Sequence, residues 1–336
     1  MTPREYDESD ARIRPSRTTR RRTKDRPSHS DSITAFVTTV DRGRTTCVTD
    51  DGVVITAMKA RELGPKSVVV GDLVEIVGDV TGTEGSLARI VVVNERTNSL
   101  SRTVDDAARV ERTIVSNIDQ LIIVVASANP EPRRGLIDRF LVSAFHESIK
   151  PIIVVTKVDI SPVPEFIQEY KALGVDIITT SSKLENRASD IEKILEALDD
   201  KISVLVGHSG VGKSTLINDL VKGADRMTGD VNDVTGRGRH TSSSAIALAL
   251  ANGGWIIDTP GIRAFGLSHL NRDRIIESFP DIYQVIQKCM PNCSHHENSC
   301  ALGPWIESEP NLRAERLIRV TSLRSLLEVK PIEEER

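Results

Sequence analysis

The sequence predicts a multidomain α/β protein with a small N-terminal β-barrel, a central, mostly parallel sheet with helices on both faces, and a helical, metal-binding C-terminal region. Five short strand patterns crowd into about 60 residues near the N-terminus, which is typical of a small barrel. Several continuous β-branched runs follow beyond residue 120, as in parallel strands that are buried on both faces. Cysteines and histidines then cluster near the C-terminus. A chain of 336 residues has room for two or three such domains.

The first 31 residues differ in composition from the rest of the chain. Residues 12–26 hold eight basic side chains and one acidic side chain, Asp25, with almost no apolar residues. Such a segment cannot bury enough apolar surface to fold, so we expect it to be disordered by itself. It is either a solvated tail or a basic arm that lies on RNA, where the release of counterions favours binding.

Residues 32–93 predict the barrel. Turn residues separate its strands at 50–52, 71–72 and 82–85. The strands are predicted at 33–40, 45–48, 53–57, 73–77 and 88–93. Their number suits an OB-fold but does not distinguish it from an SH3-like barrel. Barrels of this size either bind oligonucleotides or serve as spacers between other domains.

The central sheet is predicted from a series of apolar runs, and the loop after one of them fits the phosphate-binding pattern GxxxxGK[ST]. The runs are 121–125, 151–155, 175–178, 202–206 and 254–257. The loop consists of Gly207, His208, Ser209, Gly210, Val211, Gly212, Lys213, Ser214 and Thr215. Its glycines let backbone N–H groups surround a phosphate chain, while Lys213 supplies a charge and Ser214 offers a hydroxyl to Mg²⁺. Because an apolar helix pattern follows and helix N-termini favour anions, phosphate binding is a better interpretation than a structural glycine turn.

The loops after two of these runs predict recognition of guanine. The first matches the pattern [NT]KxD and consists of Thr156, Lys157, Val158 and Asp159. The second resembles the loop that supports guanine O6 and contains Ser181, Ser182 and Lys183. The carboxylate of Asp159 can accept the two adjacent N–H donors of guanine, a match that can discriminate against adenine by about 10⁴ to 10⁵. A surface Lys-Asp turn is the alternative, but two matching loops after successive buried strands favour base recognition.

Two further segments predict contacts to Mg²⁺ and to the γ-phosphate. The motif DTPG begins at Asp258 and resembles DxxG, so Asp258 would hold Mg²⁺ through water and the Gly261 N–H would contact the γ-phosphate. Residues 236–243 are polar and glycine-rich, which is typical of a switch loop. Thr241 is the predicted switch hydroxyl on Mg²⁺, with Ser242 as the alternative.

The order of these motifs is informative. In ordinary GTPases the phosphate loop precedes the switches and the base-recognition loops, but here base recognition comes first and DxxG comes last. The order indicates a circularly permuted GTPase, because the packing of a parallel sheet does not depend on where the chain is cut when its ends lie close together.

The C-terminal cysteines predict a closed zinc site. Cys289, Cys293 and Cys300 lie within twelve residues, with His295 and His296 between them, a set that suits Cys₃His coordination. Four protein ligands leave no open coordination position, so the metal would be structural. The polar neighbours of these cysteines argue against ordinary buried thiols. Spacing does not distinguish the two histidines.

The permuted order, the sequences GHSGVGKST, GRGRHTSS and DTPGIRAFGL, and the cysteine cluster together resemble the RsgA family of circularly permuted GTPases. The resemblance covers about residues 32–328. It implies a domain order of basic tail, OB-fold, GTPase domain, zinc-binding helical domain and short tail, at 1–31, 32–98, 103–268, 269–328 and 329–336. It also implies one zinc ion per chain, with His295 as the fourth ligand, and it places Thr156 where asparagine is commoner.

The same resemblance implies a monomeric, cytoplasmic enzyme that binds the 30S ribosomal subunit and its 16S rRNA and acts late in the maturation of that subunit. It implies hydrolysis of GTP, with Mg²⁺, to GDP and phosphate, stimulated by the subunit. Ile262 stands where many GTPases have a water-orienting glutamine, and the catalytic histidine of the family matches His240. Alternatively, His240 only contacts RNA or packs in its loop. The alternative function is a non-catalytic rRNA-binding module that uses GTP as a regulatory ligand.

Composition is consistent with this interpretation. A net charge of −4 means that RNA affinity must come from local basic patches. An aromatic content of 3% argues against extensive stacking of bases on aromatic side chains. No run approaches the roughly 18 apolar residues of a membrane span, so no membrane partner is expected. Of the four cysteines, Cys47 lies apart as an ordinary apolar residue, and the clustered three indicate zinc in a reducing cytoplasm.

Overall fold

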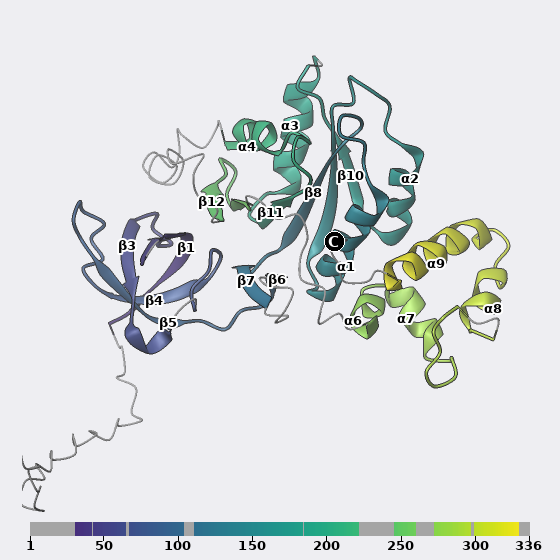
Figure 1. Cartoon of the computed structure of the whole chain (residues 1–336), viewed down its shortest axis with the longest axis horizontal. Helices are drawn as coiled ribbons and strands as arrows, with labels where there is room; N and C mark the ends of the chain where they lie inside the picture. The colour runs from purple at the N-terminus through teal and green to yellow at the C-terminus, as the bar shows by residue number, and fades with distance from the viewer. Residues whose placement is uncertain are drawn as a thin grey trace, which may run out of the picture. The chain divides into compact units, whose positions relative to one another are not determined.

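The structure is a computed structural model (Figure 1). It describes residues 31–41, 43–64, 67–103, 111–183, 185–221, 245–259, 272–296 and 299–328. The basic segment at residues 12–26 and the C-terminal tail at 329–336 lie outside the described residues.

The N-terminal strands form a closed barrel of the OB type. They are β1 (Ile33–Asp41), β2 (Arg44–Val48), β3 (Val54–Lys59), β4 (Leu73–Gly78) and β5 (Ala88–Val93), with a short 3₁₀ helix, η2 (Arg61–Leu63). The strands pair in the order β1-β2-β3-β5-β4, and β4 pairs again with β1, which closes the barrel. Alternate side chains such as Val37, Ile55 and Ile76 are fully buried inside it. The predicted five-strand barrel is therefore confirmed, and this pairing order distinguishes the OB-fold from the SH3-like alternative.

A two-stranded antiparallel ribbon links the barrel to the central sheet. It consists of β6 (Ser99–Thr103) and β7 (Glu111–Ser116). No strand was predicted here, because β6 has the sequence SLSRT, in which only one residue is apolar.

Within the described residues, the central sheet has six strands, all predicted except one. They are β8 (Gln120–Ala126), β9 (Lys150–Thr156), β10 (Asp176–Thr179), β11 (Ile202–Val206), β12 (Ile246–Ala249) and β13 (Trp255–Asp258). Their order is β10-β9-β8-β11-β13-β12, and all pair in parallel except β12, which is antiparallel to β13. The unpredicted strand, β12, also pairs with β1 at Thr39 and Ile246, so the ladder continues into the barrel.

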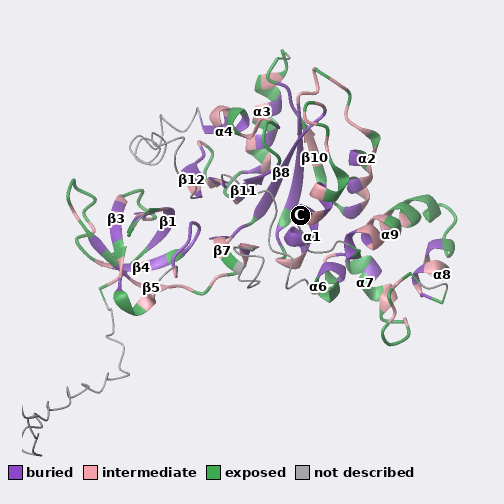
Figure 2. Cartoon of the chain, in the orientation of Figure 1, coloured by how far each residue is buried: buried purple, intermediate pink, exposed green. Residues whose placement is uncertain are grey.

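The continuous apolar runs of the sheet contribute side chains to two hydrophobic cores, one on each face. On β8, Leu121 and Ile123 enter one core while Ile122 and Val124 enter the other, as expected for a strand covered on both faces. Helix α1 (Arg134–His146) packs in the first core, and α3 (Arg187–Ala197) and α4 (Lys213–Val221) pack in the second. Two short helices, α2 (Glu165–Gln168) and η3 (Glu169–Leu173), precede β10. The strands are accordingly among the most buried parts of the chain (Figure 2).

The C-terminal region is helical and shares the first core. Its helices are α6 (Arg272–Glu277), α7 (Pro280–Ile286), α8 (Leu302–Glu307) and α9 (Arg313–Leu327). Phe279 contacts Phe145 of α1 edge to face, with ring centroids 4.9 Å apart. Arg319 of α9 donates to both carboxylate oxygens of Asp281 at 2.8 Å and to the backbone carbonyl of Ala172 in η3. Among the described residues, no helix combines the length and apolar character needed to cross a membrane.

Candidate nucleotide site and metal centre

The predicted nucleotide-binding motifs meet at one edge of the central sheet. Parallel strands end at a common edge, and ligands of open α/β sheets bind beyond it. The phosphate loop follows β11, the loop with Asp159 follows β9, the loop with Ser181 follows β10, and Asp258 ends β13. Segments up to a hundred residues apart in sequence therefore line the same site.

The phosphate loop depends on its glycines. Gly207 has φ 145°, and a Cβ atom added there would lie 2.2 Å from the carbonyl oxygen of Val124, closer than any side chain can approach. Gly210 and Gly212 have φ 82° and 96°, a region that L-residues rarely adopt. Helix α4 begins at Lys213, within the last three residues of the loop motif, so its first N–H groups point toward an anion bound in the loop.

Lys213 and Asp258 are the charged groups of this edge. The ammonium of Lys213 donates to the carbonyl oxygens of Gly207 and His208 at 2.6 and 2.9 Å, so it lies over the phosphate loop. Burial lowers the pKa of Lys213, and the charge of Asp258 opposes that shift. Burial likewise raises the pKa of Asp258, while Lys213 opposes it. A bound divalent cation would favour the ionised carboxylate further, and carboxylate and hydroxyl oxygens are the ligands that Mg²⁺ prefers.

Thr156 and Lys157 connect the loop at residues 156–159 to the phosphate loop. The hydroxyl of Thr156 lies 2.6 Å from the carbonyl oxygen of Val211 and 3.2 Å from that of Val125, and it is buried. The ammonium of Lys157 donates to the Gly210 carbonyl at 2.8 Å. The threonine that replaces the commoner asparagine therefore still reaches the phosphate loop.

Two residues of this site were missed by the sequence analysis. Ser127 donates from its hydroxyl to the Lys157 carbonyl at 2.7 Å, and the Asn129 carbonyl accepts a hydrogen bond from the Lys157 ammonium. Ser127 follows β8 directly, and Asn129 comes two residues after Ser127. Polar residues immediately after a buried strand were the available signal, since β8 ends at the same edge as β9 and β11.

Asp159 is oriented by the second base loop. Ser181 is buried and donates its hydroxyl to the Asp159 carboxylate, and the Lys183 ammonium lies 3.9 Å from the other carboxylate oxygen. The hydrogen bond from Ser181 is the main reason that the pKa of Asp159 lies below its ordinary value. The carboxylate is thus ionised at neutral pH and accepts hydrogen bonds, as guanine recognition requires. Ser182, by contrast, is exposed, and Val158 is half-buried.

Of the residues predicted to hold Mg²⁺, the structure describes Ser214 and Asp258. Ser214 lies exposed in the first turn of α4, with Thr215 beside it. Thr259 donates its hydroxyl to the Leu205 carbonyl at 2.9 Å, which holds the end of β13 beside β11. His240, Thr241, Ser242, Gly261 and Ile262 lie outside the described residues, so their predicted roles stay predictions.

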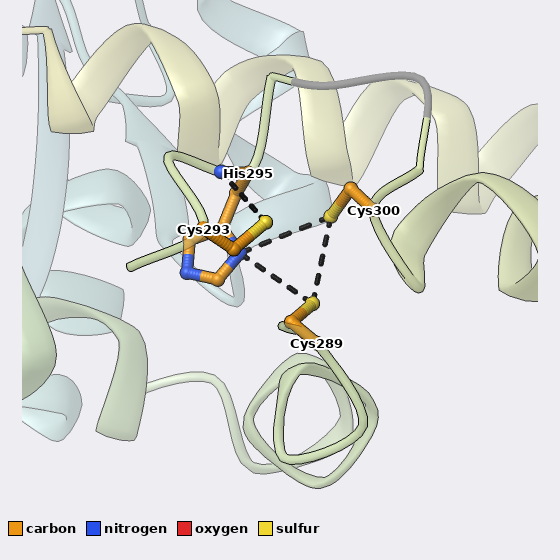
Figure 3. A group of neighbouring side chains, drawn as sticks. All are labelled: Cys289, Cys293, His295 and Cys300. Carbon is orange, nitrogen blue, oxygen red and sulfur yellow. Dashed lines mark hydrogen bonds between the residues drawn. The ribbon is translucent and has the colours of Figure 1, made fainter. Parts of the chain in front are cut away.

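The structure brings Cys289, Cys293, His295 and Cys300 together (Figure 3). Their ligand atoms all lie within 4.8 Å of one another. The sulfurs of Cys289 and Cys300 are 3.7 Å apart, and each lies 3.8 Å from Nδ1 of His295. Zn–S bonds of about 2.3 Å at tetrahedral angles would separate two sulfurs by about 3.8 Å. The spacing and the chemistry of these donors therefore fit a tetrahedral zinc ion.

His296 lies outside this cluster and points to another partner. Its Nε2 is 3.6 Å from the carboxylate of Glu328. The backbone at His295 adopts φ 67°, and its carbonyl accepts a hydrogen bond of 2.7 Å from Arg324 of α9. The tertiary structure therefore distinguishes the two histidines, which their spacing in the sequence does not distinguish. Cys47 lies in the barrel core, where burial raises its pKa to about 12, so it remains a protonated thiol.

Comparison with known proteins agrees with this geometry. Residues 93–268 match the family described as RsgA GTPase. A Chlorobaculum tepidum protein named small ribosomal subunit biogenesis GTPase RsgA is 36% identical over 254 residues, which cover 73% of this chain and 81% of that protein. A protein of the same name from Ectopseudomonas mendocina is 35% identical over 214 residues, 61% of either chain.

Two solved structures share the fold. The crystal structure of YjeQ from Thermotoga maritima aligns with a TM-score of 0.60 and 25% identity, covering 89% of this chain and 100% of that one. The structure of YloQ, described as a circularly permuted GTPase, aligns with a TM-score of 0.59 and 23% identity, covering 92% and 99%. The permuted order of motifs is therefore a property of a known fold.

Proposed function

This chain belongs to the RsgA GTPase family, and on that basis we propose that it binds GTP and hydrolyses it to GDP and phosphate during late maturation of the small (30S) ribosomal subunit. The subunit stimulates hydrolysis, and its 16S rRNA is part of the binding surface. The proposal also includes a cytoplasmic monomer, with domains at 32–98, 103–268 and 269–328. The names of the two relatives, both small ribosomal subunit biogenesis GTPases, support the ribosomal partner.

One observation carries the nucleotide assignment. The loop at residues 156–159 and the phosphate loop are joined by hydrogen bonds from Thr156 to Val211 and from Lys157 to Gly210, pairs that lie 55 and 53 residues apart in the sequence. These bonds connect the loop that carries Asp159, the proposed guanine-binding carboxylate, to the loop that carries Lys213, the proposed phosphate-binding lysine. A site of this kind suits a guanine nucleotide with a phosphate chain, because both ends are recognised at once.

The roles follow from the chemistry of each group. Asp159, oriented by Ser181, accepts the two guanine N–H donors, and Lys213 with the N–H groups of the phosphate loop binds the phosphates. Ser214, Thr241 and Asp258 would hold Mg²⁺, which when bound neutralises charge that develops on the phosphate oxygens. His240 orients the attacking water, since Ile262 has no hydrogen-bonding group. The Gly261 N–H contacts the γ-phosphate.

The permuted order links the nucleotide to the C-terminal helices. Only residues 259–271 separate Asp258 at the end of β13 from α6, and the proposed γ-phosphate contact lies within them. A change at Gly261 on hydrolysis is therefore transmitted to α6 and to the zinc-binding region rather than to another strand of the sheet. Zinc at Cys289, Cys293, His295 and Cys300 is structural, because four protein ligands fill its coordination sphere.

Two measurements test the proposal. Titration calorimetry should find tight binding of GTP and at least hundredfold weaker binding of ATP; equal affinities would refute the guanine assignment. Phosphate release should rise severalfold or more when 30S subunits are added. An unchanged rate would instead favour a non-catalytic rRNA-binding module that uses GTP as a regulatory ligand.

A further inference from the structure

Lys157 has a left-handed backbone conformation in the loop at residues 156–159. Its φ angle is 58°, a region that residues other than glycine occupy only at an energetic cost. Such a conformation persists only where the surrounding structure holds it. The ammonium of Lys157 is held by the carbonyls of Asn129 and Gly210. These contacts fix the end of the side chain but leave the orientation of the Lys157 carbonyl to be set by other groups.

The hydroxyl of Ser127 is one group that orients this carbonyl. It donates to the Lys157 carbonyl at 2.7 Å, and Ser127 is only 4% exposed, so water competes little for the bond. The Ser127 N–H donates to the Thr156 carbonyl at 2.9 Å, which extends the parallel pairing of β8 with β9 beyond the end of β8. The sheet therefore fixes the backbone of Ser127, and its hydroxyl links that fixed point to the loop.

The same carbonyl closes the turn that carries Asp159. The Ile160 N–H donates to the Lys157 carbonyl at 2.9 Å. This is an i to i+3 bond, and Val158 and Asp159 are the two central residues of the turn. A carbonyl oxygen has two lone pairs, so it accepts both donors at once. Rotation of this carbonyl would weaken both bonds and change the direction in which the Asp159 side chain leaves the backbone.

We propose that Ser127 is a positioning residue for guanine recognition. Its hydroxyl orients the Lys157 carbonyl, and the turn closed by that carbonyl aims the Asp159 carboxylate at the N–H donors of the base. Ser181 restrains the carboxylate itself, so Asp159 is held at both ends of its side chain. The inference rests on the proposed function, because only a guanine nucleotide gives the aimed carboxylate its role.

The test titrates the full-length protein and its Ser127→Ala variant with GTP and with ITP by calorimetry. The base of ITP lacks the exocyclic amino group of guanine, so ITP makes one of the two hydrogen bonds to Asp159 and gains less from an accurately aimed carboxylate. Because a buried hydrogen bond is lost, GTP should bind Ser127→Ala about five- to tenfold more weakly. ITP should lose no more than about threefold, so the preference for GTP over ITP should narrow.

Ser143→Ala is a matched control. Ser143 is 6% exposed, and its hydroxyl donates to the Arg139 carbonyl within α1 at 3.0 Å, so this variant removes a similar bond away from the loop. It should keep the affinity for both nucleotides within about twofold, whatever thermal stability it loses. Equal losses of GTP and ITP affinity in Ser127→Ala would show an effect through the phosphate loop instead of Asp159, and would overturn the proposal. An unchanged GTP affinity would also overturn it.

Hydrogen exchange distinguishes a failure of this inference from a failure of the proposed function. NMR can follow exchange of the Ile160 N–H without nucleotide, and this exchange should be at least about threefold faster in Ser127→Ala than in Ser143→Ala, because the turn is less restrained. If the wild-type chain bound no GTP, the proposed function and the role in guanine recognition would both fail, and faster exchange would still show that Ser127 anchors the turn. Normal GTP binding by the wild type, with unchanged exchange and unchanged nucleotide preference in Ser127→Ala, would refute the positioning role alone.

Discussion

Asp72 is a buried carboxylate between the barrel and the β6–β7 ribbon, and its replacement offers a quantitative test of the fold. Its side chain has no exposed surface. It accepts hydrogen bonds from Arg96 Nε at 2.6 Å and Nη2 at 2.8 Å, from the Ser116 hydroxyl at 2.6 Å, and from the Val69 N–H at 2.8 Å. The bond to Asp72 is also the main reason that the pKa of Arg96 is raised. One side chain thus connects β4, the segment before β6, and β7.

The expected cost of Asp72→Ala follows from these contacts. Removing one partner of a buried ion pair destabilises proteins by about 3–5 kcal/mol, because the remaining charge is left uncompensated. Each buried donor without an acceptor adds about 1–3 kcal/mol. The Arg96 side chain is 27% exposed, so water can partly solvate it, and the terms are not additive. We therefore expect a total of about 3–5 kcal/mol, with Asp72→Asn destabilising less because it keeps the volume and one acceptor.

Trp255 provides the assay. Its ring stacks on Phe36 of the barrel strand β1, with centroids 5.0 Å apart, so its fluorescence reports on barrel unfolding. The chain has two tryptophans, and Trp305→Phe leaves Trp255 as the single emitter. With an unfolding slope of about 2 kcal/mol/M in urea, Asp72→Ala should lower the midpoint by about 1.5–2.5 M.

A double-mutant cycle with Arg96→Ala tests whether the uncompensated charge of Arg96 causes the loss of stability in Asp72→Ala. Removing Arg96 from the Asp72→Ala protein eliminates the uncompensated charge, so the double variant should be more stable than the sum of the two single losses predicts, by at least about 1 kcal/mol. Additive losses, or a loss below about 1 kcal/mol for Asp72→Ala, would refute the reasoning.

Three further predictions concern the site and the C-terminal helices. Thr156→Val should weaken GTP binding about tenfold in calorimetry, because one buried hydrogen bond of about 1–1.5 kcal/mol is lost, and Thr156→Ser should retain the wild-type affinity. Burial raises the pKa of Asp281, but the hydrogen bond and the charge of Arg319 lower it, and the net pKa lies below the ordinary value. The ionised Asp281 therefore stabilises the folded state above the unfolded pKa of about 3.9, and this contribution is lost as pH falls through the folded-state pKa. Thermal melts between pH 6 and 3 should show this loss in the wild type and a smaller loss in Arg319→Met; equal slopes would contradict it. Cys289→Ser should lower the zinc content per chain from one to near zero, as measured by mass spectrometry, and should also lower the melting temperature. The control Cys47→Ala should keep one zinc per chain. Full zinc occupancy in Cys289→Ser would exclude the proposed ligand set.

Most of the strands were predictable because their signal is local. Runs such as 121–125 and 202–206 are β-branched and continuous, and each became a strand within one residue of its predicted ends. Strand β12 was missed because its sequence, IALA, is rich in alanine, which has low β propensity. It is a strand because β13 and β1 pair with it on both sides, a condition that no local pattern contains.

The sequence by itself determined the chemistry of the nucleotide site, since glycine, lysine and aspartate at a set spacing act through short-range backbone geometry. Tertiary structure alone decided the closure of the barrel as an OB-fold, the choice of His295 over His296 in the cysteine cluster, and the reach of Thr156 to Val211. Each of these depends on segments that are distant along the chain or on a backbone turn such as φ 67° at His295. Spacing along a sequence specifies neighbours within a few residues, whereas contacts across a fold are selected by the packing of the whole core.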